Sequence, residues 1–165
     1  MHSSLYFVCP TDCLEPVINR SFGDTNYFYT SLGNSVVFDE DTVNHIKGLI
    51  LKHNIKEISF VLSLTNPIII DALDNQSFTD IIGLNEFYEE ILRQKKNSEV
   101  LFRKHNRQFT ILSYHLNNKI RELQHALDRI GVEQPQISGK IYDQQNEVFN
   151  KIYPNLVCTE YFSLN

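Results

Sequence analysis

One segment, residues 57–70, constrains the fold of this chain most, because it has the pattern of a buried strand, a turn and a new helix in succession. Residues 58–62 are mostly apolar and lie between charged residues and turn residues, which is typical of a strand covered on both faces. Asn66 can cap the next helix, and Pro67 suits its first position. The segment therefore predicts the central strand of a parallel sheet, where ligands bind beyond the carboxyl ends of the strands.

The remaining segments predict an α/β fold with a parallel sheet of about four strands flanked by helices. Residues 5–8 and 27–30 are apolar or aromatic runs that end in turn residues, which predicts two more strands. Asp39 is expected to cap a helix that ends near residues 53–54 and serves as the crossover between parallel strands. The predicted order to this point is strand, strand, helix, strand.

The second half of the chain is expected to be mainly helical. Apolar side chains between Phe109 and Ile130 recur at spacings of three and four, which predicts a long amphipathic helix ended by Gly131. We also expect a short helix at 67–73, a loop at 74–83, a second helix at 85–96 and a C-terminal strand or hairpin at 136–152.

Composition limits the class of protein. With 165 residues, 42% of them hydrophobic, residues 1–165 are expected to form a single domain. The net charge of −5 argues against a general nucleic-acid binder. No apolar run approaches the roughly 20 residues of a membrane span, and the start of the chain has no signal-peptide pattern, so we expect a cytoplasmic protein. The three cysteines do not predict a disulfide framework.

Several local patterns resemble those of a β-class carbonic anhydrase, a zinc enzyme that hydrates carbon dioxide on a parallel sheet. Residues 9–16 are similar to the family motif C-x-D-S-R-x-x-P in the placing of the cysteine and the last proline. Residues 23–34 are similar to the segment G-D-x-x-x-x-R-N-A-G-N with one extra residue. Residues 58–63 resemble the strand that leads into G-H-x-x-C, and residues 139–143 resemble the closing strand G-W-V-Y-D. The resemblance implies the fold of that family.

The sequence departs from this family where the resemblance places the zinc ligands. The family binds zinc through the cysteine of the first motif and the histidine and cysteine of G-H-x-x-C. Cys9 keeps the first position, whereas Leu64 and Pro67 stand at the other two. A catalytic zinc needs about three protein ligands, and neither of these side chains has a lone pair to donate. Thr11 and Cys13 also replace the aspartate and arginine that orient the family's site. We therefore expect a pseudoenzyme with no zinc, no cofactor and no carbon dioxide hydration.

Two interpretations of the remaining residues stay open. In the first, a crevice at the strand ends binds a small anion or metabolite, and the chain acts as a small-ligand binding or protein-interaction module. Ser63, Thr65 and the N–H groups after Pro67 would supply donors at a helix start. In the second, Cys9, Asp12 and Cys13 form a rebuilt metal or thiol site of an enzyme. The crevice is expected to contain Cys9, Thr11, Asp12, Cys13, Ser63, Leu64, Thr65 and Asn66.

The other reactive and charged residues are expected to have ordinary roles. One of Cys9 and Cys13 is expected to be buried and the other near the surface. The histidines at 2, 45, 53, 105, 115 and 125 are predicted on helices or at the terminus; the sequence places none of them beside the strand ends, and each is expected to be solvated or at the edge of the core. The basic residues Arg93, Lys95, Lys96, Arg103, Lys104 and Arg107 are expected to form a solvated helical face. A homodimer is expected, without the helical arm that wraps the partner subunit in the resembled family.

Overall fold

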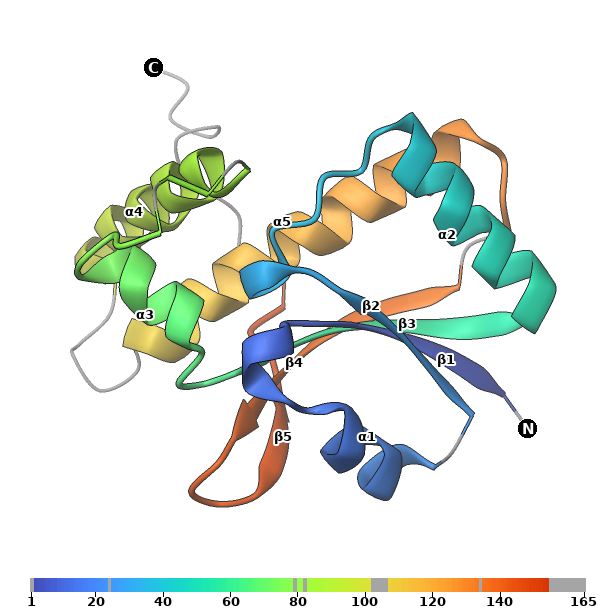
Figure 1. The fold of residues 1–165 in the computed structure, drawn as a ribbon, viewed down its shortest axis with the longest axis horizontal. Coiled ribbons are helices and arrows are strands. Elements are labelled where there is room, and N and C mark those ends of the chain that lie inside the picture. The colour runs from blue at the N-terminus through green and yellow to red at the C-terminus, as the bar shows by residue number, and fades with distance from the viewer. Residues whose placement is uncertain are drawn as a thin grey trace.

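The computed structural model describes residues 2–23, 25–78, 80–81, 83–101, 107–133 and 135–154, excluding the side chains of 97–101. Its centre is a five-stranded sheet with the order β2-β1-β3-β4-β5 (Figure 1). Four strands are parallel: β1 (Ser3–Val8), β2 (Asn26–Thr30), β3 (Ile55–Ser63) and β4 (Gln136–Asp143). The last strand, β5 (Val148–Lys151), pairs antiparallel with β4 and completes the predicted hairpin. β3 is the middle strand, as the pattern of residues 58–62 predicted.

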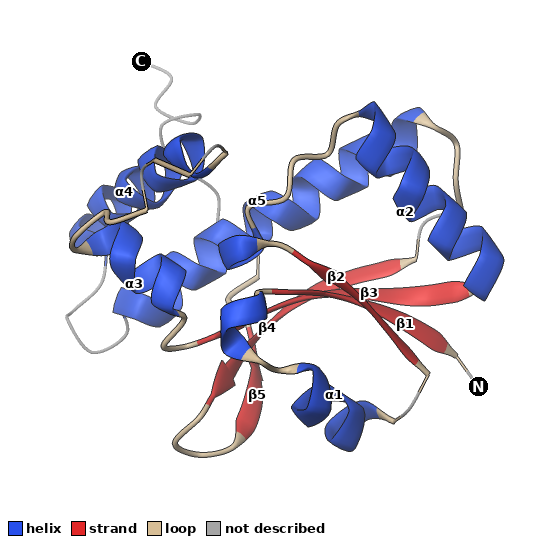
Figure 2. Cartoon of the chain, in the orientation of Figure 1, coloured by secondary structure: helices blue, strands red, loops and turns tan. Residues whose placement is uncertain are grey.

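Helices cover both faces of this sheet and the carboxyl ends of its strands (Figure 2). They are α1 (Glu15–Phe22), α2 (Glu40–His53), α3 (Pro67–Leu73), α4 (Leu84–Leu101) and α5 (Arg107–Arg129). Helix α1 lies on one face, and α2 and α5 lie on the other. Helices α3 and α4 lie beyond the carboxyl ends of the strands, next to the first part of α5. No helix within the described ranges is long and apolar enough to cross a membrane.

Alternation along the strands divides the core into a large and a small layer. Phe7 of β1 and Phe60 of β3 stack with their ring centroids 4.5 Å apart on the face covered by α2 and α5. Val8 and Val61 point to the other face, where they pack with Ile18 of α1. Because successive strand residues point to opposite faces, one apolar run supplies both layers.

Helix caps agree with the sequence predictions. The side chain of Asp39 accepts a hydrogen bond from Thr42 N at 2.8 Å, and α2 ends at Asn54 in the left-handed conformation. Gly131 adopts a positive φ of 63° just after α5. Helix ends can be predicted from such residues because a capping residue pairs backbone groups that the end of a helix leaves without partners.

Helix α1 was not predicted, so the expected order of strand, strand, helix, strand is wrong. The observed order is strand, helix, strand, helix, strand, because the parallel pair β1 and β2 also needs a crossover. Helix α1 has eight residues, and only Ile18 among them is buried. Its apolar side chains Val17, Ile18 and Phe22 lie at helical spacings, but eight residues are too few to establish a helical period from the sequence. Helix α4 also extends to Leu101, beyond the predicted end near residue 96.

Candidate functional site

The expected crevice residues lie in two loops at the carboxyl ends of the central strands. Cys9 follows β1 and precedes a short 3-10 helix, Pro10–Asp12, while residues 63–66 connect β3 to α3. Asp12 joins the two loops through both carboxylate oxygens. Its Oδ2 accepts from Ser63 N at 2.8 Å, and its Oδ1 accepts from Asn66 Nδ2 at 2.9 Å. Two segments about fifty residues apart in sequence therefore share one carboxylate.

Asn66 accepts hydrogen bonds from the free backbone N–H groups at the start of α3. This fully buried side chain accepts hydrogen bonds through Oδ1 from Ile68 N at 3.1 Å and from Ile69 N at 3.0 Å. The two amides that we expected to bind an anion are therefore already hydrogen-bonded. The nearby negative charge of Asp12 also opposes an anion at this place. Burial raises the pKa of Asp12, and the hydrogen bonds from Ser63 and Asn66 partly oppose that shift.

The two cysteines of the expected crevice have separate surroundings. Cys9 is buried, with its Sγ 3.0 Å from Thr11 Oγ1 and accepting from Gly33 N at 3.1 Å. Cys13 is exposed, and its thiol donates to Pro10 O at 3.5 Å. This confirms the prediction of one buried and one surface cysteine. Cys158 lies outside the described residues.

The donor set at the implied zinc position does not fit a zinc ion. Cys9 has a suitable ligand atom, but Leu64 packs against the apolar core and Pro67 begins α3. Their side chains have no lone pairs, so one thiol would remain where about three ligands are needed. Within the described part of the chain, no three His, Cys, Asp or Glu side chains are grouped to hold a metal ion. The rebuilt metal site expected from Cys9, Asp12 and Cys13 is therefore not supported there.

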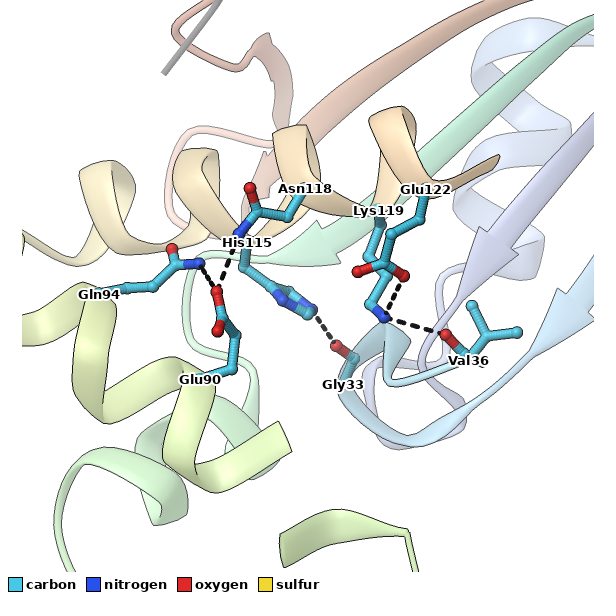
Figure 3. A network of polar contacts seen from close by, with 8 residues as sticks. All are labelled: Gly33, Val36, Glu90, Gln94, His115, Asn118, Lys119 and Glu122. Atoms are coloured by element: carbon cyan, nitrogen blue, oxygen red, sulfur yellow. Dashed lines mark hydrogen bonds and ion pairs between the residues drawn. The ribbon is translucent and has the colours of Figure 1, made fainter. Parts of the chain in front are cut away.

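A buried histidine lies beside the turn that follows β2, a neighbourhood that the sequence did not indicate. His115 of α5 is 1% exposed, and its Nε2 donates to Gly33 O at 2.8 Å (Figure 3). Because a carbonyl oxygen only accepts, Nε2 carries the proton and Nδ1 keeps a free lone pair. Nδ1 is buried and has no hydrogen-bond partner. The signal for burial was present in the sequence, because His115 adjoins Leu112 and Leu116 on the apolar stripe of α5.

Burial is the main cause that lowers the pKa of His115 to about 3, with the charge of Lys119 adding to it. The hydrogen bonds to the turn oppose this shift. The imidazole is therefore neutral at physiological pH, and Nδ1 acts as an acceptor.

The turn after β2 connects this histidine to the strand-end loops. Gly33 binds Cys9 through its N–H and His115 through its carbonyl, so one peptide segment lies between the two side chains. Asn34 is fully buried, and its Nδ2 donates to Phe7 O at 3.3 Å and Val61 O at 3.1 Å. These contacts attach the Gly33–Asn34 pair, which resembles a family motif, to both central strands.

Two of the described members of the predicted basic face have partners on the protein. Arg93 forms an ion pair with Glu90 at 3.0 Å, and Lys95 Nζ donates to Leu73 O at 3.4 Å. Arg103, Lys104 and His105 lie outside the described residues.

Comparison with known proteins identifies the fold. No protein-family model matches the chain, and no curated protein matches it in sequence. Solved structures do match. A mutant of the β-carbonic anhydrase CafD of the filamentous fungus Aspergillus fumigatus is 14% identical, with a TM-score of 0.73 over 93% of this chain and 90% of that chain. A tetrameric β-carbonic anhydrase from the ascomycete Sordaria macrospora is 15% identical, with a TM-score of 0.65 over 91% and 80%.

A β-carbonic anhydrase from Coccomyxa, solved in complex with acetazolamide, is 12% identical, with a TM-score of 0.65 over 91% of this chain and 71% of that one. At such low identities the likeness concerns the backbone arrangement, since folds persist where site residues differ. The chain therefore has the α/β fold of the β-carbonic anhydrases, as the resemblance in sequence implied.

Proposed function

We propose that this chain is a carbonic-anhydrase-like protein that does not hydrate carbon dioxide and acts as a small-ligand binding or protein-interaction module, as a homodimer. The donor set at the strand ends carries the proposal. Of the three positions that the resemblance assigns to zinc, Cys9 alone has a ligand atom, and this atom already contacts Thr11 and Gly33. Without a metal-activated water, the family's chemistry has no nucleophile at neutral pH.

The ligand of this module is proposed to bind over the crevice formed by the two loops. Thr11, Cys13 and Thr65 are its exposed members, and Asp12 lies between them and the buried Asn66. A carboxylate at this place favours a neutral or donor-bearing metabolite over an anion. The alternative, an enzyme with a rebuilt site, has less support because Cys9, Asp12 and Cys13 each bind different partners.

Metal analysis with ligand restoration tests the loss of the zinc site. The protein purified without added zinc is expected to contain much less zinc than about one ion per chain. The rate of carbon dioxide hydration in its presence is expected to equal the rate in buffer alone. Leu64→His combined with Pro67→Cys restores the implied donor set and is expected to raise bound zinc toward about one per chain. Adding Cys9→Ser to this variant is expected to remove the zinc again.

Two outcomes contradict the proposal. Measurable carbon dioxide hydration by the natural chain overturns it outright. Metal near about one per chain that disappears when Cys9 and Cys13 are both replaced by serine supports the alternative site instead. Thiol titration with and without a chelator adds an independent readout, because a metal-bound thiol reacts only after chelation.

A further inference from the structure

A cavity of about 410 Å³ lies at the outer edge of β4, near the amino ends of the strands. The pairs between β4 and β5 begin at Lys140, so within the described residues no strand lies beside 136–138 on this side. Helix α5 and the chain after β5 line the space that is left beside this edge. The crevice of the proposed function lies at the carboxyl ends of the strands, so the two places are separate.

The cavity reaches the face of the sheet on which α1 lies. Glu57 belongs to β3, which has a strand on each side, so it lines the cavity through its side chain. Because successive side chains of a strand alternate, Glu57 shares its face with Ser59. The hydroxyl of Ser59 lies 3.0 Å from Ser138 Oγ of the neighbouring strand. Ser138 and Lys140 also line the cavity, and Lys140 Nζ lies over the Phe22 ring of α1, 5.6 Å from its centroid.

Lys140, Ser59 and Ser138 form one hydrogen-bonded group with donors to spare. Lys140 Nζ donates to Ser59 Oγ at 2.7 Å and to Ser138 Oγ at 3.2 Å. An ammonium has three protons and each hydroxyl has one, and the three contacts within the group use three of these five protons. Within the described part of the chain, two donors therefore remain for an outside acceptor. Ser59 is buried, whereas Ser138 and Lys140 are partly exposed, so a ligand reaches the group from their side.

The charged residues around the cavity are mainly basic, although the whole chain has a net charge of −5. Among the described lining residues, Arg121, Lys140 and Lys151 stand against one acid, Glu57, which leaves a formal charge of +2. Arg121 and Lys151 are exposed, and neither forms an ion pair with another described residue. Burial is the main cause that lowers the pKa of Lys140; the charge of Glu57 opposes this shift and that of Lys151 adds to it. An anion bound beside Lys140 would favour its charged form.

We propose that this cavity binds a small dicarboxylate, with one carboxylate on Ser138 and Lys140 and the other on Arg121. Arg121 lines the cavity from α5, which packs on the face of the sheet opposite to α1. The cationic groups therefore lie on the two sides of the β4 edge, which suits a ligand with two separate anionic ends better than a compact anion. The formal charge of the lining complements two carboxylates, and arginine binds a carboxylate through two parallel hydrogen bonds. The volume lies near the lower end of the range for small-molecule sites.

Titration of the full chain with succinate, and separately with butyrate and inorganic phosphate, tests the proposal. Succinate is expected to bind more tightly than either of the others and to shift the ¹³Cε resonance of Lys140. Ser138→Ala removes one of the spare donors and is expected to weaken succinate binding, measured by calorimetry, about tenfold.

A pair of double variants separates the cavity from the net charge of the protein. Arg121→Gln with Lys151→Gln is expected to weaken succinate binding about tenfold or more. The matched control, Lys52→Gln with Arg129→Gln, removes the same charge at exposed positions outside this lining. It is expected to change the dissociation constant less than about twofold.

Four results would overturn the proposal. The first is an absence of succinate binding in the millimolar range. Butyrate or phosphate binding as tightly as succinate would show that the cavity does not select a dicarboxylate. Equal weakening by the two double variants would assign the attraction to net charge, and an unshifted Lys140 would place the ligand elsewhere. None of these results depends on zinc or on the crevice, so they are distinct from failure of the proposed function.

Discussion

At the scale of single residues, His115 shows how burial decides a chemical state. The side chain lies on the long helix that apolar periodicity predicted, yet it is 1% exposed and hydrogen-bonded to a turn 82 residues earlier in the chain. Its pKa of about 3 lies below the ordinary value of 6.5, mainly because burial disfavours the charged form. The unfolded chain therefore binds a proton at pH 4–6 that the folded chain does not bind, which links this residue to acid stability.

We predict that His115 makes the protein less stable in acid. Because the folded pKa is lowered, the stabilising contribution is complete above about pH 6.5 and is lost as the pH falls toward 3. The slope is at most about 1.4 kcal/mol per pH unit. His115→Gln keeps an N–H donor but cannot titrate, so urea unfolding between pH 7 and 4 should show a shallower pH dependence. The exposed His125→Gln should retain the natural slope, and equal slopes in all three proteins would contradict this account.

At the scale of elements, the turn after β2 is the point where the sheet meets α4 and α5. Gly33 has a φ of 59°, and a Cβ placed on it would lie 2.8 Å from Phe87 Cζ and 3.3 Å from Ile68 Cγ2. Glycine is needed here both for its backbone conformation and for the close approach of α4. The same turn holds β1 and β3 through Asn34, so its position affects the whole strand-end region.

Gly33→Ala is predicted to reduce the free energy of unfolding by about 2–3 kcal/mol, because it adds backbone strain and overpacking. Gly48→Ala is the matched control, since Gly48 is exposed within α2 and a Cβ there would meet nothing within 4 Å. This second change is expected to stabilise the protein by about 0.5–1 kcal/mol. Urea unfolding at pH 7 measures both. Equal stability of the natural chain and Gly33→Ala would show that the turn does not pack tightly against α4.

At the scale of the whole molecule, the exposed edge strand β5 is the described surface best suited to self-association. Large apolar side chains are exposed at several separate positions of the described surface, namely Phe22, Val37, Leu51, Ile70, Phe78, Ile81 and Val148. Phe22 also contacts Phe149 of the edge strand β5, with the rings tilted and their centroids 5.1 Å apart. Edge strands and apolar patches are common sites of association between subunits. One structural neighbour, from Sordaria macrospora, is described as tetrameric.

We predict that the purified protein is a homodimer in solution. Light scattering coupled to gel filtration should give about twice the mass of the chain, independent of salt if apolar contacts dominate. Val148→Glu with Phe22→Gln places polar groups at the β5 edge and should shift the mass toward that of one chain if this edge forms the interface. A single-chain mass for the natural protein, at every concentration tested, would contradict the prediction of a dimer.

Local patterns in the sequence were sufficient for most elements of the fold. The apolar run at 58–62, the caps at Asp39 and Asn66 and the stop at Gly131 each depend on neighbours within a few residues, so the sequence alone determined them. The resemblance that led to the fold also depends on short motifs at strand ends. The sequence alone also showed that Leu64 and Pro67 stand at two positions where the resemblance implies zinc ligands, because this depends only on residue identity.

Only the tertiary structure decided which side chains meet. Asp12 reaches Ser63 and Asn66, Gly33 lies between Cys9 and His115, and none of these pairs has a fixed spacing in the sequence. Helix α1 was likewise recognised only from the tertiary structure, in which β1 and β2 pair in parallel and therefore need a crossover between them. The physical reason is that hydrogen-bond partners, burial and the resulting pKa values depend on distances between segments that the sheet brings together, whereas caps and periodicity depend on the chain nearby.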